Sequence, residues 1–329
     1  MNKNSRIFVA GHRGLVGSAI VRRLLALGFD NLLLRSHSEL DLADPMATRE
    51  FFEIERPEFV IVAAAKVGGI HANSTLPGTF IHTNLAIQTN VLHEAWRAGV
   101  ERLLFLGSSC IYPRECPQPI KEDYLLTGQL EPTNSAYAVA KIAGIEMCRS
   151  YNLQYGMRFL AAMPTNMYGP GDNFDLETSH VLPALLRKTL EAALSGDDEV
   201  VVWGTGKPRR EFLHSDDLAD GCVMLLSLDT ATFDDFLRSH YYPLINIGYG
   251  EDITIAELAL LIARKVGYQG RLRFDSSRPD GTMRKLMDSS RMRALGWKPK
   301  IDLEQGIEQM IERLRSQFPT ARTKRAAAG

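Results

Sequence analysis

Three residues between positions 108 and 141 have the types and spacing of a proton-transfer site. Ser108 follows an apolar segment, 102–107, that predicts a strand. Tyr137 and Lys141 stand four residues apart in an alanine-rich segment that predicts a helix, so both side chains are expected on one face, one turn apart. An ammonium group beside a phenol favours the ionised phenol, and a serine hydroxyl can hold a substrate oxygen. The pattern predicts proton transfer to or from a carbonyl or an alcohol.

A glycine-rich segment, 11–17, follows the first predicted strand, 7–10, and precedes a predicted helix, 18–27. Glycines let the backbone turn sharply and approach a phosphate, and the helix N-terminus behind them offers free N–H groups. The spacing is G-x-x-G-x-x-G rather than the more familiar G-x-G-x-x-G, so the motif alone is weak. Its position between the first strand and the first helix favours a dinucleotide site over a plain turn.

Two arginines indicate which dinucleotide this is. Arg13 lies inside the glycine loop, and Arg35 ends the second predicted strand, 31–35, where an acidic residue would indicate NAD. Two guanidinium groups suit a 2′-phosphate, so NADP is predicted; the alternative is that both arginines are merely solvated. Asp41 and Leu42 are expected to border the adenine.

Short apolar segments alternate with helical ones through the first half of the chain, and the alternation ends after a predicted strand at 159–163. This order predicts an α/β fold, a Rossmann-type doubly wound parallel sheet with a smaller, mainly C-terminal lobe that binds the substrate. We expect an NADP-binding domain over 1–167 with returns near 211–248, a lobe over 168–210 and 249–316, and a mobile tail over 317–329.

Composition excludes several function classes. The 45% hydrophobic and 23% charged residues are typical of an ordinary soluble globular protein, and the net charge of −1 indicates neither nucleic-acid nor membrane partners. The longest apolar segment, 59–65, is too short to span a bilayer, and no signal peptide is recognisable. The cysteines have neither metal-ligand nor disulfide-framework spacing, so a metal-free protein of the reducing cytoplasm is expected; they are Cys110, Cys116, Cys148 and Cys222.

Taken together, these motifs resemble those of the extended short-chain dehydrogenases/reductases that act on nucleotide sugars. The resemblance reaches to about residue 314 and includes the segments 11–14, 63–70, 106–113, 131–134, 137–141 and 163–166. Within the family, the chain resembles the branch that converts GDP-4-keto-6-deoxy-D-mannose to GDP-L-fucose. That resemblance implies epimerisation at C3 and C5, followed by NADPH-dependent reduction of the C4 ketone. It also implies a homodimer formed through the predicted helices 80–97 and 137–155.

The resemblance assigns catalytic roles to five residues. It implies that Tyr137 donates a proton to the reduced ketone, Ser108 orients its oxygen, and Lys141 holds the nicotinamide ribose and lowers the pKa of Tyr137. Cys110 and His180 are implied as base and acid of the epimerisations.

The resemblance also implies two binding sets. The implied cofactor residues are Gly11, His12, Arg13, Gly14, Leu15, Val16, Gly17, Arg35, His37, Asp41, Leu42, Leu106, Gly107, Ser108, Ser109, Tyr137, Lys141, Pro164, Thr165, Asn166, Met167 and His180. The implied substrate residues are Lys188, Trp203, Arg210 and Asp280. The family pattern has a second arginine where this chain has His37, which predicts a weaker or pH-dependent preference for NADP.

Other interpretations of the same residues stay open. Without the resemblance, Cys110 is a small core residue, His180 a polar helix start, Trp203 a core aromatic, and Arg210 half of a solvated pair. The alternative enzymes are a plain 4-reductase, a C4 epimerase, a 4,6-dehydratase and a colitose-type synthase. Dehydratases usually carry Thr-Asp-Glu where this chain has 109–111. A non-catalytic NADP-binding module is the alternative from another class.

Overall fold

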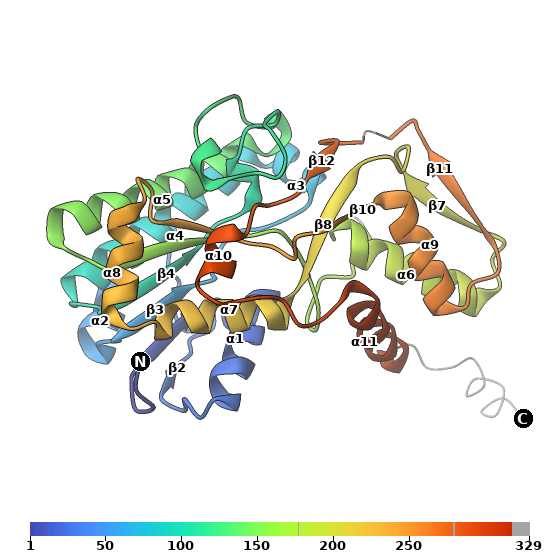
Figure 1. Ribbon diagram of the computed structural model, residues 1–329. Coiled ribbons are helices and arrows are strands. Elements are labelled where there is room, and N and C mark those ends of the chain that lie inside the picture. Colours follow the sequence, from blue (N-terminus) through green and yellow to red (C-terminus); the bar gives the residue numbers. More distant parts are fainter. Residues whose placement is uncertain (177, 279, 318–329) are drawn as a thin grey trace, which may run out of the picture.

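The computed structural model describes residues 1–176, 178–278 and 280–317, which form two lobes around the strand β8 (Arg209–His214) (Figure 1). The predicted tail lies, from residue 318 onward, outside the described residues. None of the described helices is both long and apolar enough to cross a membrane.

The larger lobe contains a parallel six-stranded sheet. Its strands lie in the order β2 (Leu32–Leu33), β1 (Ile7–Ala10), β3 (Phe59–Val62), β4 (Arg102–Leu106), β5 (Phe159–Pro164) and β9 (Leu244–Ile247). Five of them are buried along their whole length, as expected for strands covered on both faces. The predicted Rossmann-type sheet is therefore confirmed. The edge strand β2 is shorter than predicted, because it pairs only with β1 and is half buried.

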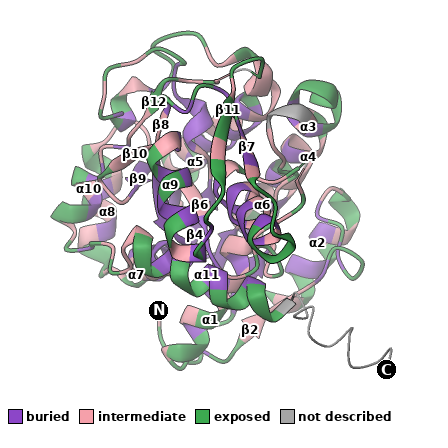
Figure 2. Cartoon of the chain, turned by 90° about the vertical axis from the view of Figure 1, so that its right-hand side faces the viewer, coloured by how far each residue is buried: buried purple, intermediate pink, exposed green. Residues whose placement is uncertain are grey.

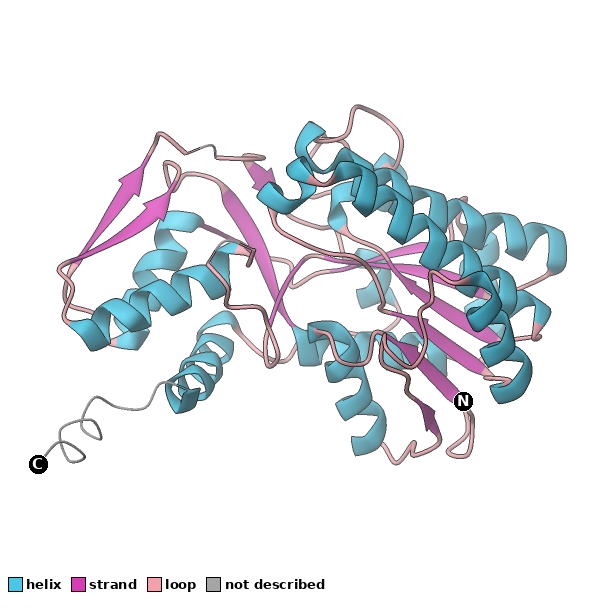
Figure 3. Cartoon of the chain, turned by 180° about the vertical axis from the view of Figure 1, so that it is seen from behind, coloured by secondary structure: helices cyan, strands magenta, loops and turns pink. Residues whose placement is uncertain are grey.

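Helices cover both faces of this sheet (Figure 3). One face packs against α2 (Pro45–Glu55), α4 (Pro77–Arg97) and α5 (Ser135–Tyr155), and the other against α1 (Leu15–Ala26), α7 (Ser215–Ser227) and α8 (Thr230–Ser239). Alternation along β1 explains the two cores: Phe8 packs against Phe51 of α2, whereas Val9 joins the cluster that contains Ile20 of α1.

The smaller lobe has two sheets and its own core. The strand β7 (Glu199–Trp203) pairs with β11 (Arg271–Asp275), and β8 belongs to a sheet with β10 (Asp252–Thr254), β12 (Arg284–Lys285) and β6 (Asn166–Tyr168). Their core is closed by α6 (Val181–Ser195), α9 (Ile255–Val266) and α11 (Leu303–Gln317). Figure 2 shows β11, which is mainly exposed, on the side of this lobe that faces the viewer. The strand β8 continues across residues 210–211, where the sequence analysis places a domain border, and the domain borders therefore remain a prediction.

Short elements complete the fold: α3 (Ile70–Thr75), α10 (Ser290–Ala294) and the 3₁₀ turns η1 (Ser109–Ile111), η2 (Glu122–Tyr124) and η3 (Pro132–Asn134). Two of the turns matter for the site, since η1 follows β4 directly and η3 leads into α5.

Candidate active site

The glycine loop lies where the order of the central sheet reverses, between β1 and β3, which is where open α/β sheets bind ligands. Gly11 has φ +82°, and a Cβ there would lie 2.7 Å from the Ala64 nitrogen at the end of β3. A Cβ on Gly17 would lie 2.1 Å from the Gly11 carbonyl oxygen. Only glycine fits either position, so the start of α1 stays open to a diphosphate.

Arg13 of the glycine loop and the residues after β2 fit a 2′-phosphate. Arg13 is exposed and, within the described part of the chain, forms no ion pair, so its guanidinium group is available to an anion. Arg35 is paired with Glu55. Glu39 accepts hydrogen bonds from the Ser36 nitrogen (2.7 Å) and hydroxyl (2.6 Å); these bonds, with Arg13 and Arg35, lower the pKa of Glu39. Through these hydrogen bonds the Glu39 carboxylate stabilises the turn that follows β2.

The next three residues of the predicted cofactor set differ in exposure, since His37 and Asp41 are exposed and Leu42 is buried. His37 is exposed and lies 3.7 Å from the carboxylate of Asp41, measured from Nδ1 to Oδ1. Leu42 is buried in the core, and its carbonyl oxygen accepts a hydrogen bond from Asn90 at 2.9 Å.

Lys141 is fixed against the end of β4. Its ammonium group donates a 2.8 Å hydrogen bond to the Leu106 carbonyl oxygen and lies 4.6 Å from the Phe105 ring centroid and 5.8 Å from that of Tyr137. Only 3% of Lys141 is exposed. Since α5 also contacts η1, the face of α5 that carries Tyr137 and Lys141 meets the strand end that carries Ser108.

The prediction that Lys141 favours the ionised Tyr137 is wrong. Burial raises the pKa of Tyr137, and the Cys110 sulfur raises it further. Burial dominates because the ammonium group is directed at the Leu106 carbonyl instead of the phenol oxygen. Tyr137 therefore keeps its proton at neutral pH, which suits a donor.

Cys110 lies beside this pair. The hydroxyl of Ser108 caps η1 by accepting a 3.4 Å hydrogen bond from the Cys110 nitrogen, and 7% of Cys110 is exposed. Burial raises the pKa of the Cys110 thiol, whereas Lys285, the hydrogen bond with Ser108, and Lys141 act to lower it. The thiol thus lies within electrostatic reach of both Tyr137 and Lys141.

His180 approaches from the smaller lobe. It is the residue before the first turn of α6, and the preceding loop packs against the segment after β3, since a Cβ on Gly69 would lie 3.4 Å from the Thr178 carbonyl oxygen. His180 is accessible to solvent, yet desolvation by the surrounding protein lowers the pKa of its imidazole, and the charge of Lys285 lowers it further. A neutral imidazole and a neutral thiol therefore predominate at neutral pH.

The predicted substrate residues gather around Trp203, which is 53% exposed at the end of β7. The Lys188 ammonium lies 4.6 Å from the indole centroid and the Arg278 guanidinium 5.0 Å from it. Asp280 accepts two 2.7 Å hydrogen bonds from Thr205, which close the turn after Trp203. The exposed indole ring can stack on a planar base, and the two cations beside it can bind a diphosphate.

Further predicted residues lie on β8 and beside it. Arg210 donates a 2.8 Å hydrogen bond to the Arg209 carbonyl oxygen, and burial lowers the pKa of its guanidinium. After β5, the Thr165 hydroxyl and the Asn166 amide both donate to the Glu211 carbonyl oxygen, at 3.3 and 2.8 Å. These bonds hold the junction of β5 and β6, which includes Pro164 and Met167, against β8.

The sequence did not indicate that Lys285 and Arg278 belong to the site. Both occur in a polar stretch whose spacing matches no motif, and only the pairing of β12 with β8 and the stacking on Trp203 reveal their place.

The chain is similar to known proteins over nearly its full length. Residues 7–236 match the NAD dependent epimerase/dehydratase family. GDP-L-fucose synthase 1 of Arabidopsis thaliana is 57% identical, with 94% of this chain and 93% of that protein covered. GDP-L-fucose synthase of Escherichia coli K12 is 52% identical, with 92% and 94% covered.

The chain is also similar to a solved structure. It is a GDP-mannoheptose C4 reductase from Campylobacter jejuni with NADP bound, 42% identical, with a TM-score of 0.88 over 96% of this chain and 99% of that one.

Proposed function

The chain belongs to the NAD dependent epimerase/dehydratase family, and we propose that within it the protein converts GDP-4-keto-6-deoxy-D-mannose to GDP-L-fucose. The reaction comprises epimerisation at C3 and C5 and NADPH-dependent reduction of the C4 ketone. The observation that carries this proposal is that Cys110 lies beside Ser108 in η1, which packs against the helix α5 that carries the reductase pair Tyr137 and Lys141.

The C4 ketone explains why one site can serve all three steps. Removing a proton from C3 or C5 produces an enolate whose charge lies on the C4 oxygen. Ser108 and Tyr137 are proposed to donate hydrogen bonds to that oxygen, as in an oxyanion hole. The same Tyr137 then gives its proton to this oxygen when the ketone is reduced, for which bound NADPH supplies the hydride.

Inversion at each carbon needs groups on both faces of the sugar. Cys110 follows β4 in the larger lobe, whereas His180 begins α6 in the smaller lobe, so the two approach from different elements. We assign Cys110 as the base and His180 as the acid; a thiol and an imidazole have reference pKa values of about 8.5 and 6.5, so they can exchange protons near neutral pH.

Incubation with NADPH and GDP-4-keto-6-deoxy-D-mannose in deuterated water tests the function. We expect GDP-L-fucose with deuterium at C3 and C5, formed in step with cofactor oxidation, as read by NMR and absorbance at 340 nm. Reduction without deuterium would instead identify a plain 4-reductase, and unchanged absorbance would identify a binding module. A preference for the 3-deoxy substrate in competition would identify a colitose-type synthase.

The rate of reduction is expected to fall as the pH rises through about 8, because burial lowers the pKa of Lys141 to about 8 and the ammonium form is the one that holds the ribose. In the unfolded chain the pKa of a lysine is near 10.5. Between about pH 8 and 10.5 the contribution of Lys141 to the free energy of unfolding therefore increases with pH. The loss of activity is therefore not unfolding. Stopped-flow reduction rates and thermal melts, both from pH 6.5 to 9.5, check this; activity that falls together with the melting temperature would contradict it.

His37→Arg is expected to lower KM for NADPH by about fivefold, because one further exposed cation beside Arg13 contributes on the order of 1 kcal/mol. KM for NADH should stay the same, since NADH lacks the 2′-phosphate. His37→Gln serves as the matched uncharged control. Equal changes for both cofactors would show that the 2′-phosphate lies elsewhere.

We also infer a homodimer through α4 and α5, which pack side by side. Apolar residues on α5 stay exposed in the single chain, among them Val139 (44%), Leu153 (71%) and Tyr155 (42%). Burying them against a second copy is favourable. Light scattering of the purified protein checks the oligomeric state.

A further inference from the structure

Lys285 is a charged residue of the cleft to which the proposed roles assign nothing. It lies in β12, which runs parallel to β8, and its register partner is Arg210. Two cations side by side on one strand pair repel each other, so each needs an anionic group nearby. Within the described part of the chain, the Lys285 ammonium has neither a hydrogen bond nor an ion pair.

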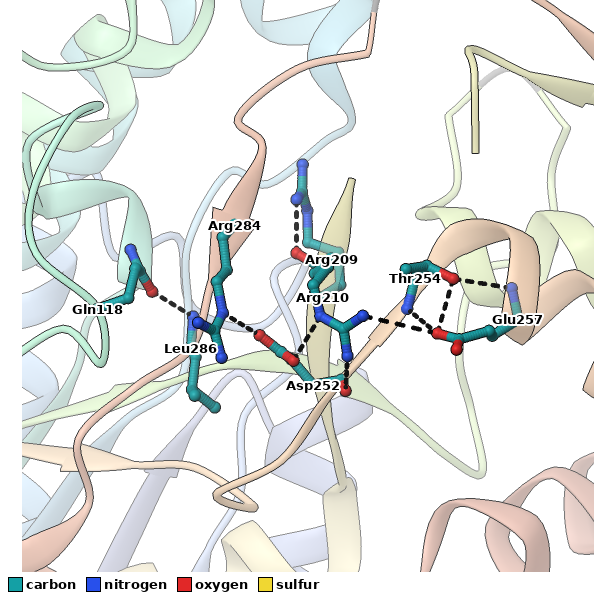
Figure 4. A network of polar contacts seen from close by, with 8 residues as sticks. All are labelled: Gln118, Arg209, Arg210, Asp252, Thr254, Glu257, Arg284 and Leu286. Carbon is teal, nitrogen blue, oxygen red and sulfur yellow. Dashed lines mark hydrogen bonds and ion pairs between the residues drawn. The ribbon is translucent and has the colours of Figure 1, made fainter. Parts of the chain in front are cut away.

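The backbone on both sides of Lys285 is held firmly (Figure 4). Arg284 Nε donates to Asp252 Oδ2 at 2.5 Å, and the Leu286 nitrogen donates to Gln118 Oε1 at 2.9 Å. Because successive side chains of a strand point to opposite faces, Lys285 points away from the carboxylate that holds Arg284. Its direction is therefore set by the fold.

That direction leads to Cys110. Lys285 and Cys110 line one small pocket together with Glu131, Thr282 and Arg284, whereas Arg210 is not part of its lining. The Lys285 ammonium acts to lower the pKa of the thiol more strongly than Ser108 or Lys141 does. Of the two neighbouring cations, Lys285 is thus the one assigned to the sulfur.

The other charged or titratable groups around Lys285 come from several elements. They are Arg210 from β8, Glu131 before η3, Tyr112, Arg114 and Cys116 after η1, His180 before α6 and Arg284 from β12 itself. Glu131 is the only carboxylate among these described neighbours, and its Oε2 already accepts hydrogen bonds from Thr133. Desolvation lowers the pKa of the Lys285 ammonium, and an anionic sulfur beside it opposes that shift.

We propose that Lys285 is the positioning residue of the Cys110 base: its ammonium group stabilises the minor thiolate form, which is the form that accepts a proton from the sugar. This role rests on the proposed epimerase activity. In the step itself the C–H bond breaks, an S–H bond forms on Cys110, and the electron pair moves to the C4 oxygen as an enolate. Lys285 keeps its proton throughout and stabilises the charge on sulfur before the transfer.

Alkylation of Cys110 in the full-length protein without substrate tests the proposal, because the thiolate is the reactive form. Trypsin separates Cys110, in peptide 103–114, from Cys116, in peptide 115–121, so mass spectrometry follows each thiol by itself. We expect Lys285→Met to shift the pH dependence of iodoacetamide labelling at Cys110 upward by about one unit, which makes labelling at pH 7 about tenfold slower.

Two further variants serve as controls. Lys298→Met removes a lysine that is exposed outside the pocket and should leave the labelling profile unchanged. Lys285→Arg keeps the charge and should restore most of the labelling rate. Lys285→Gln replaces the Met variant if that variant no longer binds NADPH. An unshifted profile in Lys285→Met or Lys285→Gln, or an equal shift in Lys298→Met, overturns the proposal.

A competing role for Lys285 in binding the GDP diphosphate makes a different prediction. It would raise KM for the sugar nucleotide and leave labelling of the free protein unchanged, which overturns our assignment. We expect the reverse, with deuterium uptake at C3 and C5 slowed about tenfold and KM little changed.

Shifted labelling in a protein that makes no GDP-L-fucose would overturn the proposed function alone. Product formation with unshifted labelling would overturn the role of Lys285 alone.

Discussion

Tyr137→Phe is expected to abolish NADPH-dependent reduction while the protein continues to exchange protons at C3 and C5. The phenol is the group that delivers a proton to the C4 oxygen, and a positioned acid contributes on the order of 10²–10⁴-fold. Burial keeps this phenol protonated, so its loss removes the donor outright. Ser108 and the Cys110–His180 pair remain, and with them the means to form the enolate. NADPH oxidation and deuterium uptake, followed in the same sample, measure the two activities separately.

The control for this substitution is the fold of α5. The Tyr137 ring packs edge-on against Phe80 with centroids 6.3 Å apart, and phenylalanine keeps that contact. We expect the melting temperature to stay near that of the wild type. Loss of reduction and exchange together in a folded variant would contradict the division of roles between Tyr137 and Cys110.

Cys110→Ser should stop epimerisation first. A serine hydroxyl has no accessible anionic form near neutral pH, so the base is lost while Tyr137 and Lys141 stay in place. We expect deuterium uptake at C3 and C5 to fall by on the order of 10²–10⁴-fold. The ketone that remains unepimerised can still be reduced, so a GDP-6-deoxyhexose other than GDP-L-fucose should accumulate. NMR coupling constants of the product distinguish the two sugars.

A matched substitution at another buried cysteine provides the comparison. Cys148 lies on α5 in the core of the larger lobe, away from the cleft, so Cys148→Ser should alter stability but not the product. Normal GDP-L-fucose formed by Cys110→Ser at the wild-type rate would remove Cys110 from the mechanism.

The sequence predicted what depends on local pattern. Strands buried on both faces are continuous apolar runs. The start of α2 also follows a local pattern, Asp44 before Pro45, because the Asp44 carboxylate accepts hydrogen bonds from the nitrogens of Met46 (2.8 Å) and Ala47 (3.1 Å). The reductase residues were found for the same reason, because a four-residue spacing on one helix determines which side chains share a face.

What sequence could not predict depends on contacts between distant segments. The sheet of β6, β8, β10 and β12 joins residues from 166 to 285, and nothing local in these short polar strands indicates their pairing. Lys285 reaches Cys110 only through that pairing. The wrong prediction for the pKa of Tyr137 has a similar origin. The four-residue spacing predicts that Lys141 lies near the phenol, but it does not predict which oxygen accepts the hydrogen bond of the ammonium group.

The division of the proposed site between two lobes has an evolutionary consequence. Ser108, Tyr137 and Lys141 all lie on the central sheet or the helix beside it, whereas His180 and Lys285 come from segments that the smaller lobe contributes. After gene duplication, drift in the smaller lobe alone could therefore erase epimerisation and leave an intact reductase.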